Sequence, residues 1–158
     1  MTDARFEDGD EAALSIKAEC VDDLAVLSAL SQDAVFCVGD IRFDARRRAL
    51  VMLVNRFRWE DAEAARRAGR GYERVRSLLV VGGVTRLRHQ GLDRQDKGTV
   101  LSVLSMDWQP GADGSGRIVM TLAGDGALAA EVECLDVMLR DVTRPYRAAS
   151  GLAPAHPA

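Results

Sequence analysis

The most distinctive feature of the sequence is a set of three Arg-x-Arg pairs on three consecutive predicted strands. The six residues are Arg56, Arg58, Arg74, Arg76, Arg86 and Arg88. Side chains two positions apart on a strand point to the same face, and consecutive strands of an antiparallel meander lie side by side. If these strands pair in order, six guanidinium groups gather at one end of one sheet. Because a guanidinium group matches phosphate and carboxylate geometry, the pattern predicts a site for a small anionic ligand or an acidic protein surface.

The alternative interpretation of the same arginines is a solvated sheet face that the protein neutralises itself. Glu131 and Glu133 are spaced by two on another predicted strand, so they could form an opposing ladder of charges. Further acids follow the first arginine pair, namely Glu60, Asp61 and Glu63. The anion-site interpretation requires all three pairs to share one face of the sheet. The solvated-face interpretation does not have this requirement.

A second functional hypothesis is a small hydrolase-like enzyme. His89 ends a predicted strand, and the loop that follows contains Asp93 and Asp96, so a His–carboxylate pair could orient a general base. The chain has no nucleophile elbow, phosphate-binding loop or dinucleotide-binding fingerprint. The three cysteines form no Cys-x-x-Cys pair and are predicted to be small buried hydrophobic residues, so we expect no metal and no cofactor. We rank an enzyme below a non-enzymatic binding or accessory protein.

The charge distribution disfavours nucleic acid as a partner. Residues 34–100 carry fifteen bases and eight acids, a net charge of +7, while the whole chain has a net charge of −3. Domains that bind nucleic acid are usually net basic and place aromatic platforms among the basic side chains. Phe57 and Trp59 alternate with Arg56 and Arg58, so on a strand they face away from them. We interpret both aromatic residues as core.

The elements that must position these residues are mostly strands. Alternation of apolar and polar residues predicts eight strands, over residues 14–20, 35–43, 49–59, 73–81, 84–90, 100–108, 117–123 and 127–134. Asp22 and Asp23 begin a helix that ends near Asp33, because carboxylates stabilise the N-terminal end of a helix.

Three segments have a less regular pattern. Residues 60–71 are interpreted as an exposed loop or a frayed helical turn, since they show no apolar stripe. Gly82 and Gly83 predict a two-residue hairpin turn. Apolar residues at helical spacing favour a second short helix over a kinked continuation of the preceding strand, which is the alternative, and they are Leu135, Met138, Leu139 and Val142.

This order of elements predicts an α+β fold, with a curved antiparallel sheet or partly closed barrel of about seven or eight strands and one or two packed helices. The single domain is expected over residues 13–145, between a disordered acidic leader at 1–12 and a flexible tail at 146–158. No apolar run approaches the roughly 20 residues that span a bilayer, so we expect a soluble, cytoplasmic protein without a membrane partner. A homodimer that forms by pairing of edge strands is a third hypothesis.

Several segments of the chain resemble a domain-of-unknown-function family of alphaproteobacteria. They are Asp23–Ala29 with Gln32–Val35, Asn55–Glu60, Gly91–Arg94, Val100–Leu104 and Val132–Leu135. The likeness covers roughly residues 12–145. It implies a bacterial protein but no substrate or catalytic residue. Genes of this family often lie beside the gene for histidinol dehydrogenase, which implies a role near histidine biosynthesis or general housekeeping.

Overall fold

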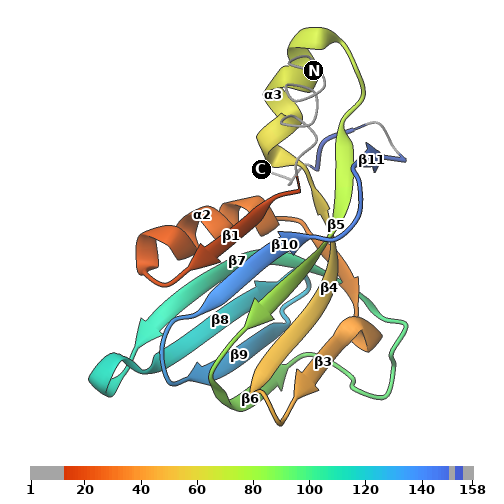
Figure 1. Cartoon of the computed structure of the whole chain (residues 1–158). Helices are drawn as coiled ribbons and strands as arrows, with labels where there is room; N and C mark the ends of the chain where they lie inside the picture. Colours follow the sequence, from red (N-terminus) through yellow and green to blue (C-terminus); the bar gives the residue numbers. More distant parts are fainter. Residues whose placement is uncertain (1–12, 150–151, 155–158) are drawn as a thin grey trace.

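A computed structural model of the chain describes residues 13–149 and 152–154. The predicted acidic leader, residues 1–12, lies outside the described residues. The described part contains two α-helices and eleven strands that form one curved antiparallel sheet (Figure 1). The predicted α+β class with a curved antiparallel sheet is therefore confirmed.

The helices are α2 (Val21–Ser31) and α3 (Trp59–Ala68), with short 3-10 turns η1 (Val38–Asp40) and η2 (Ala112–Gly114). The strands are β1 (Ser15–Ala18), β2 (Val35–Cys37), β3 (Ile41–Asp44), β4 (Ala49–Phe57), β5 (Glu73–Val81), β6 (Val84–Gln90), β7 (Val100–Pro110), β8 (Gly116–Leu122), β9 (Ala127–Val132), β10 (Val137–Asp141) and β11 (Tyr146–Arg147). Eleven strands replace the expected eight for two reasons. The segment 35–43 divides at η1 into two strands, and β10 and β11 lie where no strand is predicted.

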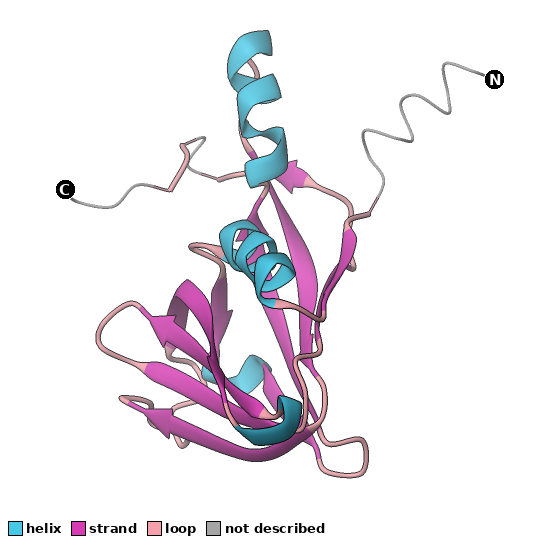
Figure 2. Cartoon of the chain, turned by 90° about the vertical axis from the view of Figure 1, so that its left-hand side faces the viewer, coloured by secondary structure: helices cyan, strands magenta, loops and turns pink. Residues whose placement is uncertain are grey.

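The sheet folds over on itself so that two layers face each other. Its strand order is β1-β10-β5-β4-β2-β7-β8-β9-β6, with β3 added to β4 and β11 added to β5. Figures 1 and 2 show β1, β10, β5 and β4 in one layer and β7, β8 and β9 in the other. Alternate side chains of both layers are buried between them, including Met52, Leu79, Val103 and Leu122. Alternation along each strand produces this single core.

Helix α2 covers the opening between the two layers, as Figure 2 shows. It buries Leu24 and Leu27 against the core and carries Asp22 and Asp23 in its first turn. The predicted helix after Asp22 is thus confirmed, with its end at Ser31. None of the helices in the described residues is long and apolar enough to cross a membrane.

Two local predictions are wrong. Residues 135–142 contain β10 rather than a helix, since Val137 and Leu139 are buried while Arg140 is exposed, and β10 pairs with β1 on one side and β5 on the other. Gly82 and Gly83 do not close a hairpin, because β5 pairs with β4 and β10 while β6 pairs with β9. This turn moves the chain from one layer to the other, and Gly83 supplies the positive φ that the turn needs.

The cysteine prediction is wrong as well. Cys20 and Cys134 are exposed and Cys37 is half-buried. Cys20 lies at the junction of β1 and α2, and Cys134 lies in the bend between β9 and β10. Neither residue is on the buried face of a strand. The prediction relied on their apolar neighbours in the sequence, and these do not report where a strand ends.

Helix α3 stands apart from the sheet, beyond the ends of β4 and β5 (Figure 1). The sequence leaves this segment open between a loop and a helical turn, and the structure has a full ten-residue helix. Only Ala65 is buried, which explains the missing apolar stripe. Gly69 ends the helix in the left-handed conformation. Polar contacts must therefore contribute much of its attachment.

Candidate functional site

The predicted arginine pairs do not share one face of the sheet. In the β4–β5 register, Arg56 lies opposite Val75, whereas Arg74 lies opposite Phe57. Directly opposed residues project to the same face, and neighbours along a strand project to opposite faces. Arg56 is therefore on one face, and Arg74 and Arg76 are on the other.

The third pair lies in a different part of the sheet. Arg86 and Arg88 are on β6, which pairs with β9 at the far end of the strand order. The expected meander of β4, β5 and β6 is wrong because the chain changes layers at Gly82 and Gly83. The six arginines consequently form three separate environments.

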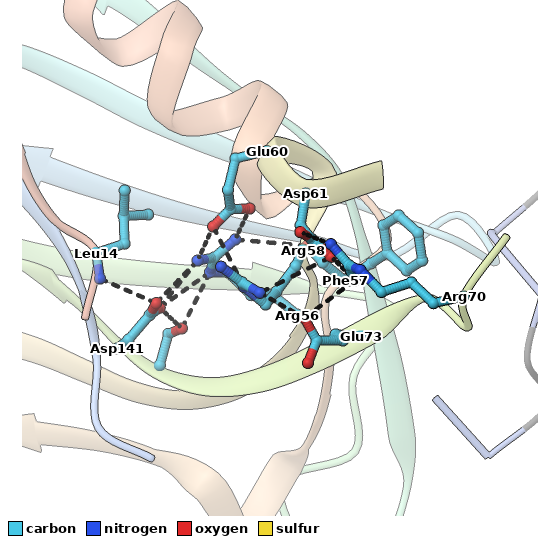
Figure 3. Close-up of polar contacts among 10 residues, drawn as sticks. Leu14, Arg56, Phe57, Arg58, Glu60, Asp61, Arg70, Glu73 and Asp141 are labelled. Carbon is cyan, nitrogen blue, oxygen red and sulfur yellow. Dashed lines mark hydrogen bonds and ion pairs between the residues drawn. The ribbon is translucent and has the colours of Figure 1, made fainter. Parts of the chain in front are cut away.

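Arg56 is the centre of a buried ion-pair network (Figure 3). Its side chain is 0% exposed. Its Nη1 and Nη2 donate to the two carboxylate oxygens of Glu60 at 2.8 and 2.7 Å. Nη2 and Nε also donate to Asp141 at 3.0 and 3.1 Å, and Nε donates to the Ser77 hydroxyl at 3.1 Å. Every guanidinium nitrogen is thus engaged, so this residue is not available to a ligand.

Asp141 extends the network to the start of the described chain. Its carboxylate accepts hydrogen bonds from the Ser77 hydroxyl at 2.7 Å and from the Leu14 backbone N–H at 3.1 Å. Arg56, Glu60 and Asp141 therefore connect β4, α3, β5, β10 and the residue before β1. We interpret the group as the attachment point of α3.

Arg58 and Arg70 form a second layer of ion pairs beside it. Arg58 Nη1 donates to Glu73 at 2.6 Å and lies 3.9 Å from Asp61. Arg70 donates two hydrogen bonds, of 2.8 and 2.6 Å, to Asp61. These pairs tie the first turn of α3 to the beginning of β5, as Figure 3 shows.

The charges of the network support one another. Burial acts to lower the pKa of Arg56, but Glu60 and Asp141 outweigh it and hold that pKa above its ordinary value. Burial likewise acts to raise the pKa of Glu60, and Arg56 outweighs it, so the pKa of Glu60 is lowered. The pKa of Asp61 is lowered mainly by its hydrogen bonds from Arg70. Arg56, Glu60 and Asp61 are therefore charged at neutral pH.

We expect the free energy of unfolding to fall steeply as the pH drops below about 4. Glu60 and Asp61 have ordinary pKa values near 4 in the unfolded chain and lower ones in the folded chain. Their ion pairs contribute fully above the unfolded pKa and are lost as the pH falls through the folded pKa. Urea unfolding at about pH 7, 5 and 3 measures this dependence. Glu60→Gln should lose less stability between the two lower pH values than the unsubstituted chain, and an equal loss would contradict the assignment.

Arg74 and Arg76 lie on the opposite face. Arg74 is half-buried and donates to the side-chain and backbone oxygens of Asn55 at 2.6 and 2.9 Å. Burial lowers the pKa of Arg74. Arg76 is exposed, and its backbone N–H donates to Thr143. This face thus holds one arginine fixed by amide oxygens and one in solvent.

The predicted counter-charges are used, but in other combinations. Glu131 accepts a hydrogen bond from Arg117 at 3.0 Å and lies 3.8 Å from Arg88. Glu133 pairs with Arg48 at 2.6 Å. Of the acids near the first pair, Glu63 binds Arg66 and Arg67 within α3. Carboxylates of the protein therefore neutralise three of the six predicted arginines, Arg56, Arg58 and Arg88, whereas Arg74, Arg76 and Arg86 have no ion pair with a described residue.

Arg86 lines a groove between two strand edges. Within the described residues, β3 pairs only with β4, and β6 pairs only with β9, so one edge of each remains open. At one end, the backbone N–H of Val84 donates to the carbonyl of Arg48 at 2.8 Å. At the other end, Gly39 donates to the carbonyl of Lys97 at 2.9 Å. The space between has a volume of about 500 Å³.

We call this space the basic groove, because four cationic side chains and no carboxylate line it: Arg42, Arg86, Arg94 and Lys97. None of the four has an ion pair or side-chain hydrogen bond with any residue in the described part of the chain. Arg86 lies opposite Glu131 in register and helps Arg117, the main cause, to lower the pKa of Glu131. The groove therefore carries concentrated positive charge, which Glu131 offsets in part at Arg86.

The remaining lining of the basic groove is largely apolar. Six apolar side chains contribute to it: Val38, Ile41, Phe43, Leu87, Leu92 and Leu128. Phe43 is 46% exposed, which is a large fraction for a phenylalanine on a strand. Cations around an apolar surface suit a ligand that has both an anionic and an apolar part.

A comparison with protein-family models gives one match. The model described as "Protein of unknown function (DUF2948)" matches residues 14–156. The chain belongs to the DUF2948 family. No curated protein and no solved structure matches it in the corresponding searches.

In this DUF2948 member, His89 also lines the basic groove. It is exposed, and among residues 13–149 and 152–154 it forms no side-chain hydrogen bond with Asp93 or Asp96. Asp93 accepts a hydrogen bond from the Gln95 backbone instead, at 2.9 Å. Those ranges also contain no cluster of three or more metal-ligating side chains. The geometry thus supports His89 as a lining residue of the basic groove.

Three cationic residues of the groove were missed by the sequence analysis. Arg42 lies on β3, and Arg94 and Lys97 lie in the loop after β6. Each is isolated in the sequence, so the search for Arg-x-Arg pairs passes over them. The only available signal is the net charge of +7 over residues 34–100, which indicates excess positive charge but not its position.

Proposed function

We propose that this DUF2948 member is a non-enzymatic binding protein that holds a small anionic ligand, or an acidic segment of a partner, in the basic groove. The single observation that supports this proposal is the set of four cationic side chains that line the groove and form no ion pair with a described residue. Like charges held together at a protein surface are stabilised by a ligand of opposite charge. The apolar lining selects a ligand that also has an apolar part.

The dimensions of the groove agree with this ligand class. Its volume of about 500 Å³ falls in the range of pockets for small molecules and short peptide segments. A carboxylate or phosphate would accept hydrogen bonds from Arg86 and Arg94, whose forked geometry fits either group. The apolar part would lie against Phe43 and Leu87. Nucleic acid fits less well, because Phe43 is the one phenylalanine, tyrosine or tryptophan in the lining of the groove.

The proposal keeps Arg86 and His89 from the predicted site residues and replaces the others. Arg56 and Arg58 are held by carboxylates inside the ion-pair network, and Arg74 is held by Asn55. We also propose a cytoplasmic location in a bacterium and a role near histidine biosynthesis, which the resemblance to the alphaproteobacterial family supports. Pairing of edge strands into a homodimer stays a prediction, although β6 would then oppose arginine to arginine.

Binding of anilinonaphthalene sulfonate, a fluorescent probe with an anionic group and apolar rings, tests the proposal. The double substitution Arg86→Ala/Arg94→Ala removes two charge-assisted donors, so we expect the Kd of the probe to rise about tenfold. Fluorescence titration at low and moderate salt measures the Kd. The affinity should also fall with salt, because the attraction is electrostatic.

The matched control is Arg46→Ala/Arg47→Ala. These two arginines are exposed in the turn between β3 and β4 but do not line the basic groove. The control removes the same charge from the same end of the molecule, so its Kd should stay within about twofold of the unsubstituted chain. Equal weakening by the two double variants would show that overall charge, rather than the groove, determines binding. Far-UV circular dichroism confirms that each variant is folded.

A further inference from the structure

We infer that residues 1–12 of the same chain occupy the basic groove and compete with its external ligand. This inference rests on the proposed function, because it names a particular acidic segment as occupant of that site. Residues 1–12 read MTDARFEDGDEA and contain five acids and one base. Their net charge of −4 complements the four cations of the groove.

The apolar part of the segment also fits. Phe6 is its one aromatic residue, and Glu7 and Asp8 follow it directly. The groove has the complementary combination, since the apolar Phe43 and Leu87 lie beside the cationic Arg42 and Arg86 in its lining. An extended segment alternates its side chains, so Phe6 would pack on the apolar lining while neighbouring acids meet the arginines.

The segment is long enough to reach the groove. The chain is fixed at Leu14, whose N–H and carbonyl bind Asp141 at 3.1 and 2.8 Å. From β1, the strands β10, β5, β4 and β3 lead to the groove in four steps, about 19 Å at the usual strand spacing, and Phe43 lies about 13 Å further along the strands than Leu14. The direct separation is then about 23 Å. Phe6 is eight residues before Leu14, and eight extended residues span up to about 28 Å, so a nearly extended segment places Phe6 at the groove.

Tethering makes even a weak contact effective. A segment attached by a short linker has an effective concentration of about 1 mM. If the free peptide bound with a Kd of about 0.1 mM, the tethered segment would weaken an external competitor about tenfold. Occupancy by residues 1–12 would thus raise the concentration of external ligand that is needed to fill the groove.

The experiment uses the full chain and a synthetic peptide of residues 1–12 labelled with fluorescein. In the neutralised variant, amides replace the five acids through Asp3→Asn, Glu7→Gln, Asp8→Asn, Asp10→Asn and Glu11→Gln. Fluorescence anisotropy should show that this variant binds the labelled peptide about tenfold more tightly than the unsubstituted chain. Arg5→Gln is the matched control, because it makes the segment more acidic and should weaken peptide binding further. Adding Arg86→Ala/Arg94→Ala to the neutralised variant should remove most of the gain.

The outcomes separate this inference from the proposed function. If the neutralised and unsubstituted chains bind the peptide equally, while anilinonaphthalene sulfonate still responds to Arg86→Ala/Arg94→Ala, the self-occupancy is refuted and the binding function stands. If the peptide binds but responds only to Arg144→Ala/Arg147→Ala, residues 1–12 bind near β11 and the inference is overturned. If neither probe responds to the groove substitutions, both proposals fail.

Discussion

Replacing Arg56 with alanine should lower the free energy of unfolding by about 3–5 kcal/mol. The guanidinium group is 0% exposed and binds Glu60 and Asp141 at 2.7 and 3.0 Å. Removing it leaves Asp141, which is itself 4% exposed, as a buried carboxylate without its cation. Removing one partner of a buried ion pair lowers the free energy of unfolding strongly, because the remaining charge is buried and uncompensated. Replacing the whole pair by apolar residues has a much smaller effect.

Urea unfolding followed by circular dichroism at neutral pH measures this loss. Arg88→Ala is the matched control, since Arg88 is 51% exposed and its pair with Glu131 is 3.8 Å long, and we expect a change within about 0.5 kcal/mol. Arg56→Lys should fall between the two, because lysine keeps the charge but not the planar fork that reaches two carboxylates. A loss below about 1 kcal/mol for Arg56→Ala would show that water replaces the guanidinium group and that the network is not sealed.

The Arg-x-Arg pattern includes arginines with two different roles, attachment of α3 and lining of the basic groove. Arg56 and Arg58 form ion pairs with carboxylates and position α3, whereas Arg86 belongs to a groove without carboxylates. Both groups are arginines on strands with similar spacing in the sequence. The two groups differ in the segment that packs against each strand. Carboxylates lie beside Arg56 and Arg58, and none lines the groove that contains Arg86.

Short-range patterns predicted most of the fold. Alternation identified β4, β5, β7, β8 and β9 within a few residues of their observed ends. It failed for β10, because Leu135, Met138 and Leu139 fit a helical period as well as part of a strand. The pairing of β10 between β1 and β5 decides the matter, and that pairing joins residues more than 50 positions apart.

The candidate site could be predicted only in part for the same reason. Arg56 and Asp141 are 85 positions apart, so their contact depends on β10 being a strand. The basic groove depends on the edges that stay open, since β6 leaves β5 at Gly83 and joins β9. A sequence reports which residues are charged, but the sheet order determines which of those charges meet.

The second large effect is expected from Phe57→Ala, which should lower the free energy of unfolding by about 3–5 kcal/mol. Phe57 is 0% exposed and ends β4 immediately before α3. Its ring lies 4.6 Å from the ring of Trp59, edge to face, and 5.6 Å from the ring of Tyr72. Trp59 begins α3 and donates its indole N–H to the carbonyl of Gln32 at 2.9 Å. Truncation would leave a cavity where β4, α3 and the segment before β5 meet.

The comparison with Phe43→Ala makes this prediction specific. Phe43 is also a strand phenylalanine, but it is 46% exposed on β3, so its truncation should change stability by less than about 1 kcal/mol. The same substitution removes apolar surface from the basic groove and should weaken binding of anilinonaphthalene sulfonate about threefold to tenfold. Phe57→Ala should show the opposite pattern, a large loss in urea unfolding with little change in probe affinity for the molecules that remain folded. If both substitutions lowered stability and affinity together, the groove and the α3 attachment would have to be one cooperative unit, because effects at independent sites remain separate.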